Sequence, residues 1–176
     1  MKEYFTKAIV LSVNPFLEKD KTVSLFTKDF GKIEAKIVGG QKMLSKFSPH
    51  FNILNLVAIR IVKKNNFTIT DVVTENYFPN LKEDKKLFLK SLNILFLLKK
   101  TLQKEIADEH LWHFLLNSLE SSKINIRDVL KILGYNPAFA SCKNCHNKEV
   151  KYFLVSDEVF ACEKCARNIS IKEAIS

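Results

Sequence analysis

The chain has 176 residues, a formal net charge of +9 and 47% hydrophobic residues. This length fits one large domain or two small ones, and the apolar share is too high for an intrinsically disordered protein. The N-terminal segment carries charges where a secretory signal needs an apolar run. The apolar run 91–98 is far shorter than the roughly 20 residues that span a bilayer. We therefore expect a soluble, cytoplasmic protein.

The first part of the sequence predicts β-structure. The third of its apolar runs alternates hydrophobic and charged residues, which predicts a strand with Lys32 and Lys36 on a face in water. Five short strands separated by turn residues predict a small closed barrel, for which the oligonucleotide-binding (OB) type is the natural candidate. The runs are 7–13, 21–27, 32–38, 51–62 and 67–73.

Beyond residue 78 the periodicity becomes helical. Apolar residues recur at helical spacing between positions 87 and 102. Asn80, Asp108 and Asn125 are placed to cap three helices, and Gly134 is placed to end the third. The fold class expected from both parts is α+β, a barrel followed by a small helical domain.

All four cysteines lie in two C-x-x-C pairs, Cys142 with Cys145 and Cys162 with Cys165. In a reducing compartment such pairs are more typical of metal ligands than of disulfides, and the sixteen residues between them match a four-cysteine zinc site. The intervening residues predict a hairpin that joins the pairs. An iron site of similar geometry and a redox dithiol pair remain as alternatives.

This zinc ion is expected to be structural. Four thiolates close the coordination shell, whereas a catalytic zinc keeps a position open for water. His146 is expected to be an exposed polar residue, and the sequence nearby has no His-x-Glu or His-Glu-x-x-His motif that would supply a general base. We therefore expect no enzymatic activity, an OB-fold nucleic-acid-binding domain at 1–78, and a helical domain at 79–176 with a zinc-binding hairpin at 141–166.

The positive charge is one-sided within the barrel sequence. From Ala35 to Thr70 there are six basic residues and no acidic one. Cations combined with aromatic rings are what single-stranded nucleic acid binds, although lysine excess alone also fits composition bias or solubility. The candidate DNA contacts are Lys32, Lys36, Lys42, Lys46, Phe47, Arg60, Lys63 and Lys64.

The order of these parts resembles the bacterial RecO family of DNA-repair and recombination-mediator proteins. Residues 8–35 resemble the opening strands of that family, and 39–56 resemble its basic loop and following strand. Residues 73–84 resemble its exit from the barrel, and 130–145 its approach to the zinc site. Four segments in the same order are more specific than any one of them.

The resemblance implies a DNA-repair and homologous-recombination mediator that binds single- and double-stranded DNA and anneals complementary strands. It implies as partners the ring-forming RecR and the acidic, Phe-ended tail of the single-stranded DNA-binding protein (SSB). It also implies an indirect link to the RecA recombinase, which is loaded onto SSB-coated DNA. Such a protein would be cytoplasmic and nucleoid-associated, with no membrane partner.

The chain ends eleven residues after Cys165, where the family usually has further helices that contribute to the SSB-tail pocket. We therefore expect a short form in which Lys99, Lys100 and Lys104 meet an acidic tail. A different class of function also stays open. It is a protein-interaction adaptor that uses the zinc hairpin and the helices without binding DNA.

Overall fold

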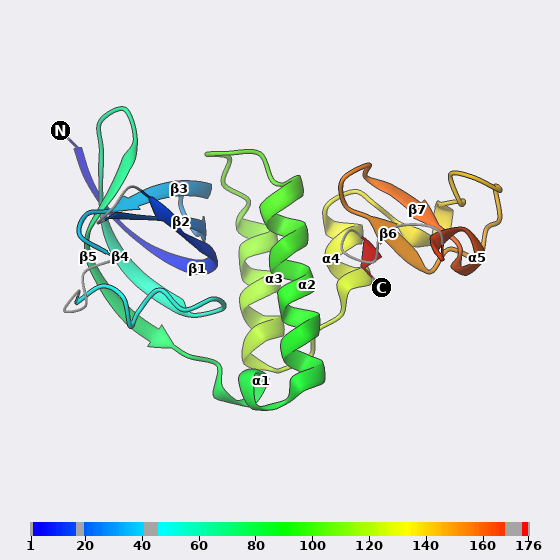
Figure 1. The fold of residues 1–176 in the computed structure, drawn as a ribbon, viewed down its shortest axis with the longest axis horizontal. Helices are drawn as coiled ribbons and strands as arrows, with labels where there is room; N and C mark the ends of the chain where they lie inside the picture. Colours follow the sequence, from blue (N-terminus) through cyan, green and yellow to red (C-terminus); the bar gives the residue numbers. More distant parts are fainter. Residues whose placement is uncertain (1, 17–19, 41–45, 168–173, 176) are drawn as a thin grey trace.

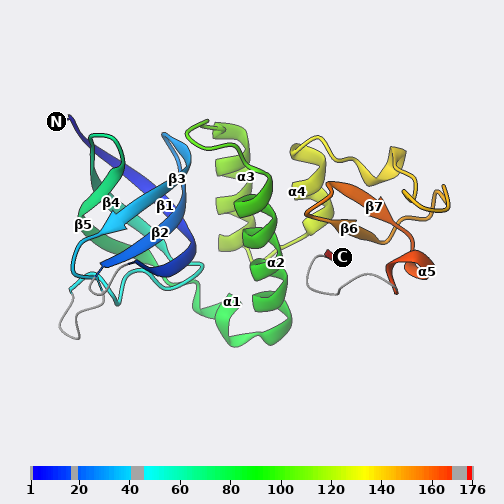
Figure 2. The same cartoon turned by 45° about the horizontal axis from the view of Figure 1, so that its top comes forward.

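The computed structural model describes residues 2–16, 20–40, 46–167 and 174–175. An N-terminal barrel, a pair of helices and a C-terminal module follow one another along the long axis of the molecule (Figure 1), and Figure 2 shows the same order. Within the described ranges, no helix is both long enough and apolar enough to cross a membrane.

Five strands close the barrel in the order β1-β2-β3-β5-β4. β3 and β5 are parallel, and the other neighbouring pairs are antiparallel. A five-stranded barrel of this kind is the OB type, so the predicted fold class is confirmed. The strands are β1 Lys2–Phe16, β2 Asp20–Thr27, β3 Gly31–Ile37, β4 Leu56–Lys63 and β5 Phe67–Asn76.

The predicted strand at 51–62 begins later than expected, at Leu56. The reason is a turn before it: Leu54 has a left-handed backbone with φ of 77°, which interrupts an extended chain. Leu54 N still donates to Val10 O at 3.0 Å, and Val10 N donates to Asn55 O at 3.0 Å. Phe51, at the start of the predicted run, lies before β4 and is buried in the barrel interior.

Two of the three predicted helix caps are confirmed. Asp108 Oδ1 accepts from Leu111 N at 2.8 Å, and Asn125 Oδ1 accepts from Arg127 N at 3.0 Å. Gly134, with φ of 92°, follows the end of the third helix as predicted. The helices are α1 Pro79–Glu83, α2 Lys85–Thr101, α3 Glu109–Glu120 and α4 Ile126–Ile132.

The prediction that Asn80 caps the first long helix is wrong. Pro79 already begins the short α1, so Asn80 lies inside that helix. The long helix α2 is capped instead by Asp84, whose Oδ1 accepts from Lys86 N at 2.8 Å and from Leu87 N at 3.0 Å. Asp84 therefore satisfies two of the N–H groups that have no partner within the helix.

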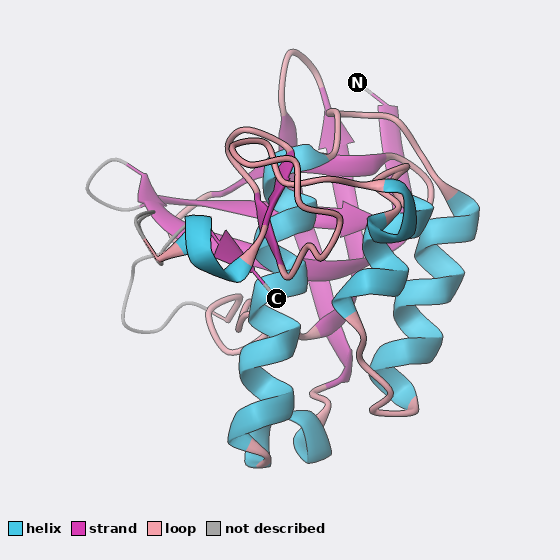
Figure 3. Cartoon of the chain, turned by 90° about the vertical axis from the view of Figure 1, so that its right-hand side faces the viewer, coloured by secondary structure: helices cyan, strands magenta, loops and turns pink. Residues whose placement is uncertain are grey.

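One apolar core joins the barrel, the helices and the C-terminal module. Phe26 of β2 packs against Trp112 of α3 with ring centroids 5.7 Å apart. At the other end of this core, Phe153 packs on Tyr135 with centroids 4.9 Å apart. Figure 3, which looks from the C-terminal module, shows the helices lying in front of the barrel strands. The helix pair therefore covers the β2–β3 side of the barrel.

The C-terminal module contains the predicted hairpin. Its strands β6 (Tyr152–Leu154) and β7 (Val159–Ala161) are antiparallel. The short η1 (Pro137–Phe139) precedes the hairpin, and α5 (Glu163–Ala166) follows it. A third strand that the sequence did not predict, β8 (Ala174–Ile175), pairs with β6. Two residues are too few to show a periodic pattern.

Candidate functional site

The four cysteine sulfur atoms gather beside the β6–β7 hairpin. All four lie within 4.8 Å of one another, and the Sγ atoms of Cys145 and Cys162 are 3.5 Å apart. A tetrahedral zinc site with Zn–S distances near 2.3 Å has sulfur atoms about 3.8 Å apart. The donor set therefore fits one tetrahedral metal ion.

Backbone turns hold each pair of cysteines in place. In the first pair, His146 N donates to Cys142 O at 2.9 Å, and His146 has a left-handed backbone with φ of 59°. In the second pair, Cys162 directly precedes α5, and Ala166 N donates to Cys162 O at 3.0 Å. The His146 side chain is exposed and lies outside the sulfur cluster, as expected.

The neighbouring thiols shift one another's pKa values in opposite directions. Backbone hydrogen bonds from Cys162 and Cys145 lower the pKa of the Cys142 thiol to about 6. Hydrogen bonding with Cys145, Cys162 and Cys142 raises the pKa of the Cys165 thiol to about 12. Four thiolates at this spacing repel one another, so a bound cation is what allows all of them to ionise. With four protein ligands the shell is closed, which suits a structural ion.

A second group of residues meets at one end of the barrel. Lys36 Nζ lies 5.5 Å from the ring centroid of Phe16, which is 41% exposed. Lys21 Nζ donates to Ser48 Oγ at 3.3 Å, which ties β2 to the loop that follows β3. In that loop Lys46 Nζ lies 5.3 Å from the ring centroid of Phe47. We call these residues the barrel-end cluster: Phe16, Lys21, Lys36, Lys46 and Phe47.

The cluster contains three of the predicted DNA contacts, Lys36, Lys46 and Phe47. Phe16 and Lys21 were missed by sequence reasoning. Phe16 is the last residue of β1 and Lys21 is the second of β2, and OB folds commonly bind oligonucleotides beside the connection between their first two strands. Their position beside this connection was the signal in the sequence that could have identified them. Lys42 lies outside the described residues.

An acidic residue restrains this cluster. Lys36 Nζ pairs with Asp20 Oδ2 at 2.7 Å. The other carboxylate oxygen of Asp20 accepts from Gly39 N at 2.8 Å. Asp20 therefore links the start of β2 to the end of β3 and offsets part of the positive charge of Lys36.

The expectation that Lys32 faces water is wrong. Its side chain is 7% exposed, and its Nζ donates to Lys99 O at 2.8 Å. Burial lowers the pKa of Lys32; the carboxylate of Glu34 opposes this shift, and the ammonium groups of Lys104 and Lys99 add to it. The cause is tertiary: the end of α2 covers this part of β3. The ammonium of Lys32 is thus engaged inside the protein.

The other predicted DNA contacts lie away from the cluster. Arg60 stands on the outer face of β4, with its guanidinium carbon 4.8 Å from the ring centroid of Phe5. Lys63 pairs with Glu105 and lies 4.7 Å from the ring centroid of Phe67. Lys64 is exposed on the hairpin between β4 and β5. The seven predicted contacts that lie within the described residues therefore do not form one continuous site.

The three lysines expected to meet an acidic tail lie near the end of α2. Lys99 and Lys100 are in its last turn, and Lys104 follows the helix. Lys100 and Lys104 are exposed, and Lys100 Nζ lies 5.9 Å from the ring centroid of Phe96. Lys99 is half-buried, and its carbonyl oxygen is the one that Lys32 contacts.

Comparison with known proteins identifies the family. Residues 1–77 match the family model for the N-terminal part of recombination protein O. DNA repair protein RecO of Caldanaerobacter subterraneus subsp. tengcongensis is 30% identical over 184 residues, which cover 96% of this chain and 73% of the relative. The chain belongs to the RecO family.

Two further RecO relatives agree with this assignment. DNA repair protein RecO of Thermodesulfovibrio yellowstonii is 28% identical, covering 93% of this chain and 70% of the relative. That of Caldicellulosiruptor bescii is 29% identical, covering 98% and 76%. As a RecO-family member the chain belongs to DNA repair and recombination, and the four cysteines are positioned to bind a metal ion.

Proposed function

We propose that this RecO-family chain binds single- and double-stranded DNA and anneals complementary strands, and that with RecR it helps load RecA onto SSB-coated DNA. The barrel-end cluster is the observation that supports this proposal. Three lysines and two phenylalanines from separate segments meet at one end of an OB-type barrel. Lysines neutralise phosphates, and aromatic faces stack with unpaired bases.

Annealing requires that two negatively charged strands approach each other. Each phosphate neutralised by a lysine releases counterions, so the affinity for single strands falls as the salt concentration rises. In a plot of log affinity against log salt concentration, each such contact adds about −0.7 to the slope. Lys36 enters such a contact only by sharing or leaving its pair with Asp20. We therefore expect Lys46 and Lys21 to contribute more per residue than Lys36.

We propose that the metal ion held by the four cysteines is one structural zinc. When bound, zinc supplies a tetrahedral cross-link between the two cysteine pairs. The hairpin between the pairs is anchored by Phe153 in the main core, so the cross-link stabilises the module against the helices. An iron ion in the same thiolate shell is the alternative that metal analysis decides.

Charge reversal in the cluster tests the DNA-binding proposal. Lys36→Glu combined with Lys46→Glu should weaken binding of a fluorescent single strand, slow annealing and make the salt slope shallower by up to about 1.4. The matched control is Lys123→Glu with Lys148→Glu, the same charge change on exposed lysines outside the barrel. If the two double variants bind and anneal alike across a salt titration, the cluster is not the site.

We propose that the acidic SSB tail meets Lys99, Lys100 and Lys104. Reversal of the exposed pair Lys100 and Lys104 to Glu should weaken binding of an SSB-tail peptide and slow annealing of SSB-coated strands. Annealing of bare strands should stay unchanged. Equal loss on bare and coated strands would place these lysines in DNA binding instead.

One observation favours an adaptor that does not bind DNA. Lys63 is paired with Glu105 and Lys36 with Asp20, so two predicted DNA contacts already have acidic partners. A chain without affinity for DNA at low salt that still forms a complex with RecR would support the adaptor. The same measurement would reject the mediator.

A further inference from the structure

The helices cover much of the barrel face that OB folds commonly use for oligonucleotides. That face is the outer side of strands 2 and 3. Here Ser24 and Phe26 of β2 are fully buried, and Lys32 of β3 is held by the end of α2. The barrel-end cluster lies at the end of this face that stays open. A longer ligand must therefore use another face of the barrel.

The outer face of β1, β4 and β5 carries a groove of about 510 Å³. β4 and β5 lie on the side of the barrel away from the helix pair (Figure 1). Phe5 of β1 and Val73 of β5 line the groove on either side of β4, and they are 67% and 60% exposed. Two apolar side chains this exposed beside one hollow make this face a candidate binding surface.

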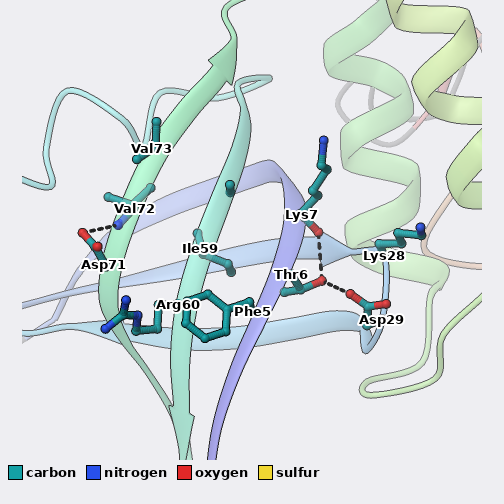
Figure 4. Close-up of a pocket in the computed structure, with 11 residues that line it drawn as sticks. Phe5, Thr6, Lys7, Lys28, Asp29, Ile59, Arg60, Asp71, Val72 and Val73 are labelled. Carbon is teal, nitrogen blue, oxygen red and sulfur yellow. Dashed lines mark hydrogen bonds between the residues drawn. The ribbon is translucent and has the colours of Figure 1, made fainter.

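A cation–π pair lies within this groove. The guanidinium of Arg60 is held over the ring of Phe5, beside which it lies in Figure 4. Arg60 Nε is 3.8 Å from Glu3 Oε1, and within the described part of the chain this nitrogen makes no hydrogen bond. An aromatic ring and a guanidinium plane are the two side-chain surfaces on which unpaired bases stack.

The charges around the groove nearly cancel, with three cations against four carboxylates, whereas cations outnumber carboxylates in the barrel-end cluster. Lys7 pairs with Glu75 at 2.8 Å, and Asp29 accepts from Thr6 Oγ1 at 2.6 Å. A track for successive phosphates would need an excess of cations. A groove without an excess of cations instead suits a neutral, flat part of a ligand. The charged side chains are Lys7, Lys28 and Arg60 against Glu3, Asp29, Asp71 and Glu75.

We infer that this groove binds unpaired bases of single-stranded DNA, with Phe5 as the stacking surface. The inference rests on the DNA-binding function proposed above and adds a second contact surface to it. The barrel-end cluster holds phosphates, and the groove holds bases. Lys28, exposed at the end of the groove nearest the helices in Figure 4, is placed to contact the phosphate next to a bound base.

The test separates base stacking from charge. Phe5→Ala should lower affinity for a single-stranded oligonucleotide at least about fivefold, the lower end of base–aromatic stacking. The salt slope should stay the same, as should affinity for an abasic strand with equal phosphates. The control is Phe139→Ala, which removes a phenylalanine that is 89% exposed in the C-terminal module. Thermal unfolding checks that both variants fold.

A second variant tests the aromatic face itself. Phe5→Leu keeps apolar bulk in the groove, and it should lose affinity as Phe5→Ala does. The inference is overturned if Phe5→Leu binds as tightly as the wild type. It is also overturned if Phe5→Ala and Phe139→Ala bind equally well, and the groove would then be a surface for a protein partner. If Lys36→Glu with Lys46→Glu weakens binding while Phe5→Ala does not, the inference fails alone. If the wild type binds no single strand, the proposed function fails with it.

Discussion

The ammonium group of Lys32 in β3 donates a hydrogen bond to the main-chain carbonyl oxygen of Lys99 in the last turn of α2, at 2.8 Å. The last carbonyl groups of a helix have no partner within the helix. A cation there also interacts favourably with the negative end of the helix dipole. A lysine of the barrel thus satisfies the end of a helix that is 67 residues away in the sequence. This bond fixes the helix pair against the barrel.

The first prediction follows from this bond. Lys32→Met keeps the length of the side chain but leaves the carbonyl oxygen of Lys99 without its donor, so we expect a loss of about 1–3 kcal/mol in the free energy of unfolding. DNA affinity should hardly change. Lys36→Met is the control on the same face of β3, and it should lose more DNA affinity and less stability than Lys32→Met. Urea unfolding and DNA binding of both variants decide this, and a Lys32→Met variant that lost only DNA affinity would contradict it.

The second prediction concerns pH. Burial holds the pKa of Lys32 in the folded protein below its ordinary 10.5, which the unfolded chain keeps. Between these two values the unfolded state binds more protons, so the contribution of Lys32 to stability rises as pH rises through that window. The difference in unfolding free energy between wild type and Lys32→Met should therefore grow from neutral pH towards about pH 10. A constant difference in urea unfolding would rule this out.

The position of Lys32 shows where sequence reasoning stops. Alternation along β3 correctly places Lys32 and Lys36 on one face, because the side-chain period of a strand is two. It says nothing of what covers that face. The cover comes from α2, far along the chain, and only tertiary packing decides that Lys32 is buried while Lys36 is half-exposed.

Sequence patterns predicted correctly those features that depend on residues close together in the chain. The caps at Asp108 and Asn125 and the cysteine cluster follow from spacing within a few residues or from a hairpin. The prediction of Asn80 as a cap failed because Pro79 begins a short helix that already contains Asn80. Asp84, four residues further on, is an equally good capping residue and caps the long helix instead. Phe16 was missed because a single aromatic residue at a strand end has no pattern to mark it.

The third prediction uses a close approach between β3 and the α2–α3 connection. Gly31 has φ of 63°, and a Cβ added there would lie 1.8 Å from the carbonyl oxygen of Ile106. Gly31→Ala should therefore force the α2–α3 connection away from β3. Gly134→Ala is the matched control, because Gly134 also has positive φ but has no atom within 4 Å of the added Cβ.

We expect Gly134→Ala to cost only the backbone penalty of about 1–2 kcal/mol and Gly31→Ala to cost clearly more. Urea unfolding of the two variants makes the comparison. Equal losses would mean that the connection at Ile106 yields without cost, against the close packing described here.

The fourth prediction concerns the metal. One zinc ion per chain is expected by metal analysis, and Cys142→Ser should lower both metal content and melting temperature, because structural zinc couples to folding. At a temperature where Cys142→Ser is folded, its affinity for single-stranded DNA should stay close to that of the wild type, since the barrel-end cluster and the groove lie in the barrel. His146→Ala, next to Cys145 but outside the sulfur cluster, should keep its metal. Metal-free protein of unchanged melting temperature would refute the site.

The fifth prediction places a reporter in the barrel-end cluster. The chain has a single tryptophan, Trp112, which is buried against Phe26. In Phe16→Trp, the fluorescence that a bound ligand can quench directly therefore comes from the introduced indole. Stacking of a base on that indole should quench it when a single strand binds, and duplex DNA, whose bases are already stacked, should quench it less.

The companion variant Phe16→Ala should lose at least about fivefold in single-strand affinity, the lower end of stacking on one base. Its salt slope should stay close to that of the wild type, because no cation is removed. A single strand that binds Phe16→Trp tightly without changing its fluorescence would show that Phe16 lies outside the interface. The cluster would then act through its lysines and Phe47 alone.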